Sequence, residues 1–130
     1  MKVIIICGGN SLEKEISIQT GMYVNASLKK TFETEILFLK NNYNQIKKIY
    51  NKGDVIFNAL HGGYGENGEI QHFFEQENFK FIGSGSKACK IAMDKHFCKS
   101  IAASINIQTP YGKKIESYNS IYDNFEKPFI

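Results

Sequence analysis

The chain has 130 residues, of which 42% are hydrophobic and 22% are charged. This composition suits one compact domain and excludes the disordered, collagen-like and coiled-coil classes. All sixteen basic residues are lysine, against thirteen carboxylates, and the resulting net charge of +3 is spread along the chain, so the sequence predicts no dedicated nucleic-acid surface.

The longest early apolar run, residues 3–7, is too short to span a membrane or to form the core of a signal peptide. We therefore expect a cytoplasmic protein without a membrane partner. The three cysteines, Cys7, Cys89 and Cys98, form no C-x-x-C pair. This pattern favours reduced, mostly buried thiols over a disulfide framework or a zinc site, and no metal ligands are expected within this chain.

Apolar runs and glycine turns alternate along the first hundred residues. Four strands are predicted, at 2–7, 34–39, 54–60 and 79–82. Helical patterns follow Ser11 and Gly68 and cover 87–93 and 94–104, while 41–52 is a short polar helix or a loop. Strands alternating with helices predict an α/β fold, with a Rossmann-like, mostly parallel sheet and flanking helices. Ligands should gather at the carboxyl ends of its strands.

The composition of the sequence changes near Pro110. The residues that follow are mostly polar and show no regular apolar pattern. We interpret residues 1–108 as the α/β domain and 109–130 as a linker and the beginning of a second domain. Residues 127–130 are typical of the start of a strand, so the chain is expected to end inside that second domain.

The segment from Gly8 to Ser17 is a polar loop that follows the first strand and leads into a helix. In one interpretation the glycines form the turn, Asn10 or Ser11 caps the helix, and Glu13 lies near the positive end of the helix dipole. In the other, Glu13 is held above the sheet and binds a substrate ammonium, because a carboxylate shielded from water needs a cationic partner.

A glycine-rich segment, residues 58–68, follows the third predicted strand. Its glycines allow positive φ angles and close approach of the backbone to a ligand. His61 stands at the carboxyl end of that strand, beside the first loop in the predicted sheet, where its ring could orient a carboxylate. A single histidine in such a place is also often a hydrogen-bonded packing residue.

Residues 83–88 fit the pattern G-x-G-x-x-A between a strand and a helix. This is the dinucleotide-binding pattern, but the acidic residue expected about 20 positions later is missing. We therefore interpret the segment as a simple turn.

The next polar pair is Asp94-Lys95. Asp94 could cap the helix that follows it. Lys95 is either a solvated helix lysine or a cation for a nucleotide phosphate, which lysine can bind as a point charge.

Taken together and in this order, these segments resemble the N-terminal domain of the D-alanine-D-alanine ligases, which are members of the ATP-grasp superfamily. The resemblance covers essentially the whole chain. Its most specific elements are residues 8–17, 58–62, 65–71, 83–85 and 92–95.

The resemblance implies an enzyme that uses ATP, with Mg²⁺ or Mn²⁺, to convert the carboxylate of one D-alanine into an acyl phosphate. The amine of a second D-alanine attacks this group and gives the dipeptide of peptidoglycan. By the same resemblance, Glu13 is catalytic and holds the ammonium of the first D-alanine, His61 lies near its carboxylate, and Lys95 reaches the ATP phosphates. A homodimer is implied for the full-length enzyme.

In the family, the remaining nucleotide-binding and metal-binding residues lie in the central and C-terminal domains. We therefore expect a ligase truncated before its ATP-grasp domains, which by itself neither ligates nor binds nucleotide and metal tightly. Two alternatives stay open. One is a non-catalytic binding or dimerisation module that uses Phe73, Phe74 and Phe97, and the other is the N-terminal domain of another ATP-grasp ligase.

Overall fold

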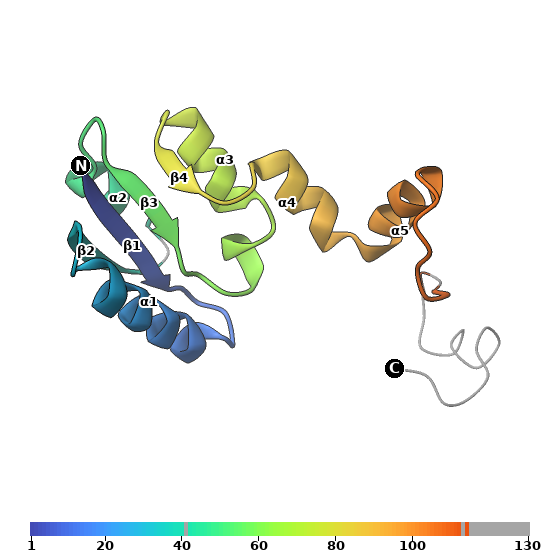
Figure 1. Ribbon diagram of the computed structural model, residues 1–130, viewed down its shortest axis with the longest axis horizontal. Coiled ribbons are helices and arrows are strands. Elements are labelled where there is room, and N and C mark those ends of the chain that lie inside the picture. The colour runs from blue at the N-terminus through green and yellow to red at the C-terminus, as the bar shows by residue number, and fades with distance from the viewer. Residues whose placement is uncertain (41, 113, 115–130) are drawn as a thin grey trace. The chain divides into compact units, whose positions relative to one another are not determined.

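The computed structural model describes residues 1–40, 42–112 and 114, so the predicted strand start at 127–130 lies outside the described residues (Figure 1). The strands are β1 (Lys2–Gly8), β2 (Glu33–Leu39), β3 (Val55–Asn58) and β4 (Lys80–Ile82). The helices are α1 (Lys14–Leu28), α2 (Asn44–Ile49), the 3-10 turn η1 (Gly63–Gly65), α3 (Glu69–Gln76), α4 (Ser86–Met93) and α5 (Lys95–Ser104).

The four strands form one parallel sheet in the order β2-β1-β3-β4. The predicted α/β class and parallel sheet are therefore confirmed, with strand ends that differ by one or two residues from the predicted ones. Internal contacts divide the chain into one unit covering Met1–Met93 and a second that begins at Asp94 and contains α5. The domain boundary near residue 108 stays a prediction.

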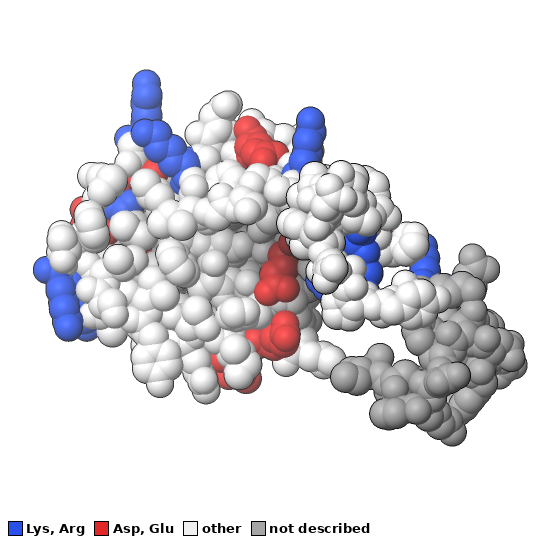
Figure 2. All heavy atoms as spheres, turned by 45° about the vertical axis from the view of Figure 1, so that its right-hand side comes forward, with Lys and Arg blue, Asp and Glu red and all other residues white. Residues whose placement is uncertain are grey.

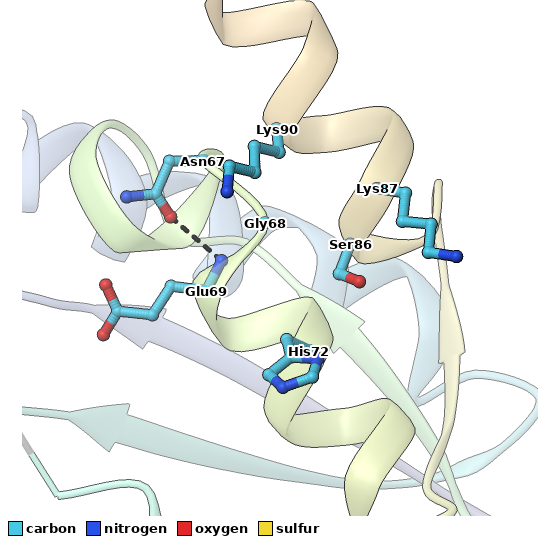
Figure 3. Close-up of a pocket in the computed structure, with 7 residues that line it drawn as sticks. All are labelled: Asn67, Gly68, Glu69, His72, Ser86, Lys87 and Lys90. Carbon is cyan, nitrogen blue, oxygen red and sulfur yellow. Dashed lines mark hydrogen bonds between the residues drawn. The ribbon is translucent and has the colours of Figure 1, made fainter.

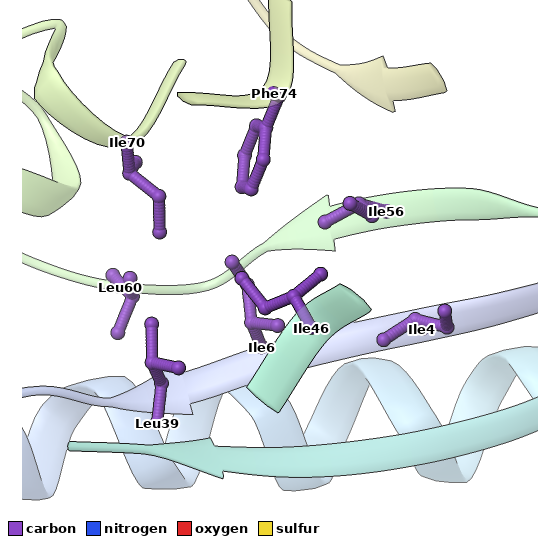
Figure 4. Close-up of a cluster of buried hydrophobic side chains, with 8 residues drawn as sticks. All are labelled: Ile4, Ile6, Leu39, Ile46, Ile56, Leu60, Ile70 and Phe74. Carbon is purple, nitrogen blue, oxygen red and sulfur yellow. The ribbon is translucent and has the colours of Figure 1, made fainter. Parts of the chain in front are cut away.

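The two faces of the sheet are covered by different helices. Because side chains alternate along a strand, the even-numbered residues of β1 point to one face and the odd-numbered ones to the other. Ile4 and Ile6 pack with α2 and α3 (Figure 4), whereas Val3, Ile5 and Cys7 pack toward α1. The first cluster comprises Ile4, Ile6, Leu39, Ile46, Ile56, Leu60, Ile70 and Phe74.

Helix α1 contacts the sheet through small residues. Ser17 and Gly21 are its buried residues, while Ile16 and Met22 are 54% and 50% exposed. Hydrophobicity alone therefore does not identify the face of α1 that packs on the sheet. Gly21 explains the close approach, because a Cβ atom there would lie 2.8 Å from Cβ and Sγ of Cys7.

The cysteines differ in their burial. Cys7 is fully buried, and burial raises the pKa of its thiol. Cys89 and Cys98 are half-buried, and none of the three forms a disulfide. Of the phenylalanines considered for a docking surface, Phe74 is a core residue, Phe73 packs against the core, and Phe97 is 49% exposed.

Among the described residues, no helix combines the length and apolar character needed to cross a membrane. On the face shown in Figure 2, lysine side chains project at several places around the margin, and several carboxylates lie near one another toward the middle.

Asp54 connects the start of β1 to the turn before β3 through hydrogen bonds. Its carboxylate accepts hydrogen bonds from the backbone N–H of Lys2 at 2.9 Å and of Asn51 at 3.0 Å. Burial alone would raise the pKa of Asp54, but these two N–H donors and the nearby positive charges lower it below its usual value. The ionised form is therefore the one that stabilises the fold.

Replacing Asp54 by asparagine should lower the free energy of unfolding by about 1–2 kcal/mol at neutral pH, because an amide offers a single acceptor oxygen. A pKa lowered by folding gives stability that is complete above the unfolded value, about 3.9, and is lost as the pH falls through the folded value. Urea unfolding between pH 7 and pH 2.5 should show the two proteins converging in acid. Asp94→Asn is the control, since asparagine caps helices as well as aspartate does. If the difference in unfolding free energy between the wild type and Asp54→Asn stayed constant in acid, this role of Asp54 would be contradicted.

Candidate functional site

Two polar loops leave neighbouring parallel strands at the same edge of the sheet. The loop 9–13 follows β1 and leads to α1, and the loop 59–62 follows β3 and leads through η1 to α3. The helices that these loops lead to, α1 and α3, cover opposite faces of the sheet, and the loops leave it at the point where the strand order reverses. Open α/β sheets bind their ligands at such a point.

Ser11 joins these two loops. Its hydroxyl donates a 2.6 Å hydrogen bond to the backbone carbonyl of His61 and accepts the N–H of Glu13 at 3.2 Å. One side chain therefore fixes the backbone beside both predicted site residues. The local chemistry is that of a serine turn, in which a short hydroxyl side chain bonds the backbone two residues on.

Glu13 is the N-cap residue of α1, and its side chain makes no capping hydrogen bond. The expectation that Asn10 or Ser11 would occupy the N-cap position is therefore wrong. The residue is exposed, and its Oε2 lies against Gly62, where a Cβ atom would be 2.7 Å away. Gly62 has a φ of +68°, so both its backbone conformation and its lack of a side chain suit this contact.

His61 is half-buried and has a polar partner at each ring nitrogen. Nε2 lies 3.1 Å from Oγ1 of Thr20 on α1. Nδ1 lies 3.7 Å from Oε1 of Glu66, in the turn before α3. The ring therefore bridges α1 and the glycine-rich loop, and it is not sealed within apolar packing.

Sequence reasoning singled out Glu13 but missed Ser17 and Thr20, which lie on the same face of α1. Glu13, Ser17 and Thr20 follow the spacing i, i+4, i+7, which places them on one face of the helix. The buried Ser17 hydroxyl accepts the N–H of Gly8 at 2.8 Å and donates to the carbonyl of Ala59 at 2.7 Å. All three residues thus contact the end of β3 or the loop that follows it, and their spacing from Glu13 was the signal that could have identified Ser17 and Thr20.

Two amide side chains hydrogen-bond to the backbone of the glycine-rich loop. Asn58 and Gln71 each donate a 2.9 Å hydrogen bond to the carbonyl of Gly65. Gly65 also packs so closely that a Cβ atom would lie 2.6 Å from Cβ of Leu60. These contacts fix the loop that carries Glu66.

A cavity of about 350 Å³ adjoins His61. Its walls come from the end of β3, the glycine-rich loop, α3 and the turn after β4, and they include Glu66, Gln71 and Ser84. Glu13 is not among the described residues that line it. The cavity therefore extends from His61 toward β4, whereas Glu13 lies on the β1 side of His61.

A second cavity, of about 390 Å³, lies between the first turns of α3 and α4 (Figure 3). Lys90 reaches toward Asn67 there, whereas Lys87 points away. The helix ends around it already have protein partners, since Asn67 accepts the N–H of Glu69 and Glu75 accepts the N–H of Ser86.

Lys95 belongs to the second unit, as the first residue of α5. The predicted cap is confirmed, because the Asp94 carboxylate accepts the N–H of Phe97 at 2.9 Å. Lys95 is exposed, and the role proposed for it stays a prediction. Among the described residues, no three His, Cys, Asp or Glu side chains form a group that could hold a metal ion.

Comparisons with known proteins agree with this architecture. The family model described as D-ala D-ala ligase N-terminus matches residues 39–84. A D-alanine-D-alanine ligase of Fusobacterium nucleatum is 40% identical over 111 residues, which are 85% of this chain and 39% of that protein. One of Zymomonas mobilis is 35% identical over 130 residues, covering 98% of this chain and 40% of the relative.

Among solved structures, the D-alanine-D-alanine ligase of Bacillus anthracis complexed with ATP matches with a TM-score of 0.76 and 35% identity. The match covers 85% of this chain and 39% of that one. The chain thus spans about two fifths of the length of the curated relatives it matches.

Fold and site together define a doubly wound α/β domain with polar loops at its strand-order reversal. In sequence and in fold, the chain is a relative of the N-terminal domain of the D-alanine-D-alanine ligases. The resemblance drawn from the motifs is therefore confirmed.

Proposed function

We propose that this chain forms the part of a cytoplasmic D-alanine-D-alanine ligase that binds the first D-alanine. The observation that carries this proposal is the junction of the two loops. The Ser11 hydroxyl bonds the His61 carbonyl, and the Glu13 carboxylate lies against Gly62. The family match supports the assignment of the domain to such a ligase. On the family resemblance, we also propose that the full-length enzyme is a homodimer.

The side chains of this site suit a small zwitterion. The exposed carboxylate of Glu13 would bind the ammonium of D-alanine in a charge-assisted hydrogen bond, and the imidazole of His61 would orient the carboxylate. A domain that holds the substrate in this way lowers the barrier by fixing the orientation in which its carboxylate reacts.

We propose a single contact between this chain and the nucleotide. ATP, when bound, supplies the phosphoryl group that activates the substrate carboxylate, and the structure of the Bacillus anthracis ligase contains ATP. From this chain, Lys95 would offer a point charge to its phosphates. We assign no ligand of Mg²⁺ or Mn²⁺ to this chain, because the described residues contain no group of three His, Cys, Asp or Glu side chains that could hold a metal ion.

The test uses a chimera in which this chain replaces the matching N-terminal stretch of the Fusobacterium nucleatum ligase. Glu13→Gln should raise KM for the first D-alanine about 30- to 100-fold, the loss expected for one charged hydrogen bond, with KM for ATP changed less than threefold. Glu15→Gln, in the first turn of the same helix, is the control and should change neither value by more than about twofold. Steady-state kinetics measures both constants.

Equal effects of Glu13→Gln on D-alanine and ATP would count against Glu13 as an ammonium ligand. Equal effects of Glu13→Gln and Glu15→Gln would mean that the negative charge at the start of α1 affects D-alanine binding without a specific contact from Glu13. Loss of D-alanine affinity confined to Glu13 would favour a ligase domain over a non-catalytic docking module.

A further inference from the structure

The ring of His61 is held from two sides by groups within the same unit. Thr20 Oγ1 lies 3.1 Å from Nε2, and Glu66 Oε1 lies 3.7 Å from Nδ1. The imidazole side chain is 35% exposed, so it is partly shielded from water. With a partner at each nitrogen, the plane and the direction of the ring are both defined.

These partners differ in what they can do for a neutral imidazole, which carries its proton on one nitrogen. An ionised carboxylate only accepts, so the nitrogen that faces Glu66 is favoured to carry the proton. At 3.7 Å this is a Coulomb attraction rather than a direct hydrogen bond. Nε2 is then an acceptor, and the Thr20 hydroxyl can donate to it.

We propose that Thr20 is a positioning residue that, together with Glu66, holds neutral His61 in the Nδ1–H tautomer. His61 and Glu66 both line the cavity of about 350 Å³, so Nδ1–H is the ring donor on the Glu66 side. In the proposed function, this N–H is the donor that a substrate carboxylate meets. That last consequence rests on the proposed function, whereas the tautomer itself does not.

Nitrogen NMR of the 130-residue chain, labelled with ¹⁵N at histidine, measures the tautomer directly at a pH near 8.5, where an ordinary imidazole is neutral. Long-range ¹H–¹⁵N correlations distinguish a protonated from an unprotonated ring nitrogen. The wild-type chain should show His61 mainly as Nδ1–H. Thr20→Val keeps the shape but removes the hydroxyl, and it should shift the ratio of the two tautomers about fivefold toward Nε2–H, the change expected from losing one hydrogen bond.

Thr20→Ser retains the hydroxyl and should restore the wild-type ratio. His72, whose Nδ1 lies 4.0 Å from Oε2 of Glu75 on α3, provides an internal control in the same spectra, and its signals should not move. Glu66→Gln, at an exposed position, should also shift His61 toward Nε2–H. It remains informative if the valine variant fails to fold.

A wild-type ring found mainly as Nε2–H would overturn the proposal. So would a folded Thr20→Val protein with an unchanged tautomer ratio. The measurement needs neither substrate nor catalysis, so its failure would leave the assignment of Glu13 to D-alanine standing, and a failure of that assignment would leave the tautomer result standing.

Discussion

Replacing Ser17 by alanine should lower the free energy of unfolding by about 2–4 kcal/mol, a large effect for the loss of one hydroxyl. The side chain is fully buried, and its oxygen bonds the N–H of Gly8 and the carbonyl of Ala59. Alanine removes both bonds and leaves two buried backbone groups short of a partner, each of which costs about 1–3 kcal/mol. Urea unfolding followed by circular dichroism measures the change.

Ser27→Ala supplies the matched control, since Ser27 lies on the exposed face of the same helix. There the substitution should be neutral or slightly stabilising, because alanine has the higher helix propensity. The two bonds of Ser17 join the ends of β1 and β3, so amide hydrogen exchange at Gly8 should also accelerate in Ser17→Ala alone. Equal losses of stability in the two variants would show that Ser17 contributes no more than an ordinary helix residue.

The strands and their order along the chain could be predicted because each strand is indicated by the residues within it. The run from Val3 to Cys7 is buried on both faces, and a parallel strand in that position has a continuous apolar sequence. Helix α1 was harder to predict, because its contact with the sheet depends on Ser17 and Gly21. Small and polar residues reach the interior there through close packing and hydrogen bonds, which hydropathy does not measure.

The site could be predicted in part. Glu13 and His61 could be expected at one edge of the sheet because polar loops after parallel strands gather there, and their roles stay predictions. Their supporting contacts were not found, since Thr20 and Glu66 meet His61 only after α1 and the glycine-rich loop have folded against each other. A preference for such a contact is not visible in either segment alone, although the spacing of polar residues along α1 hinted at it.

Replacing Gly62 by alanine should weaken D-alanine binding while leaving most of the fold intact. The added methyl group would lie 2.7 Å from Oε2 of Glu13, which is the free end of a flexible side chain. That carboxylate can swing away at small cost to stability, but it then leaves the position from which it would meet an ammonium. In the chimera with the Fusobacterium nucleatum ligase, we expect KM for the first D-alanine to rise about tenfold, equivalent to about 1.4 kcal/mol, with KM for ATP unchanged.

Gly63→Ala separates this displacement from backbone strain. Gly62 and Gly63 both have positive φ angles, +68° and +49°, so alanine at either position should cost about 1–3 kcal/mol of stability, with the larger loss at Gly62, whose ψ of 170° belongs to a region that essentially only glycine adopts. Around Gly63, however, no atom lies within 4 Å of the added methyl group among the described residues. Gly63→Ala should therefore lower stability through backbone strain without raising KM for D-alanine. If both variants raised it equally, strain in the glycine-rich loop would be the cause, and the contact between Glu13 and Gly62 would have no part in holding the substrate.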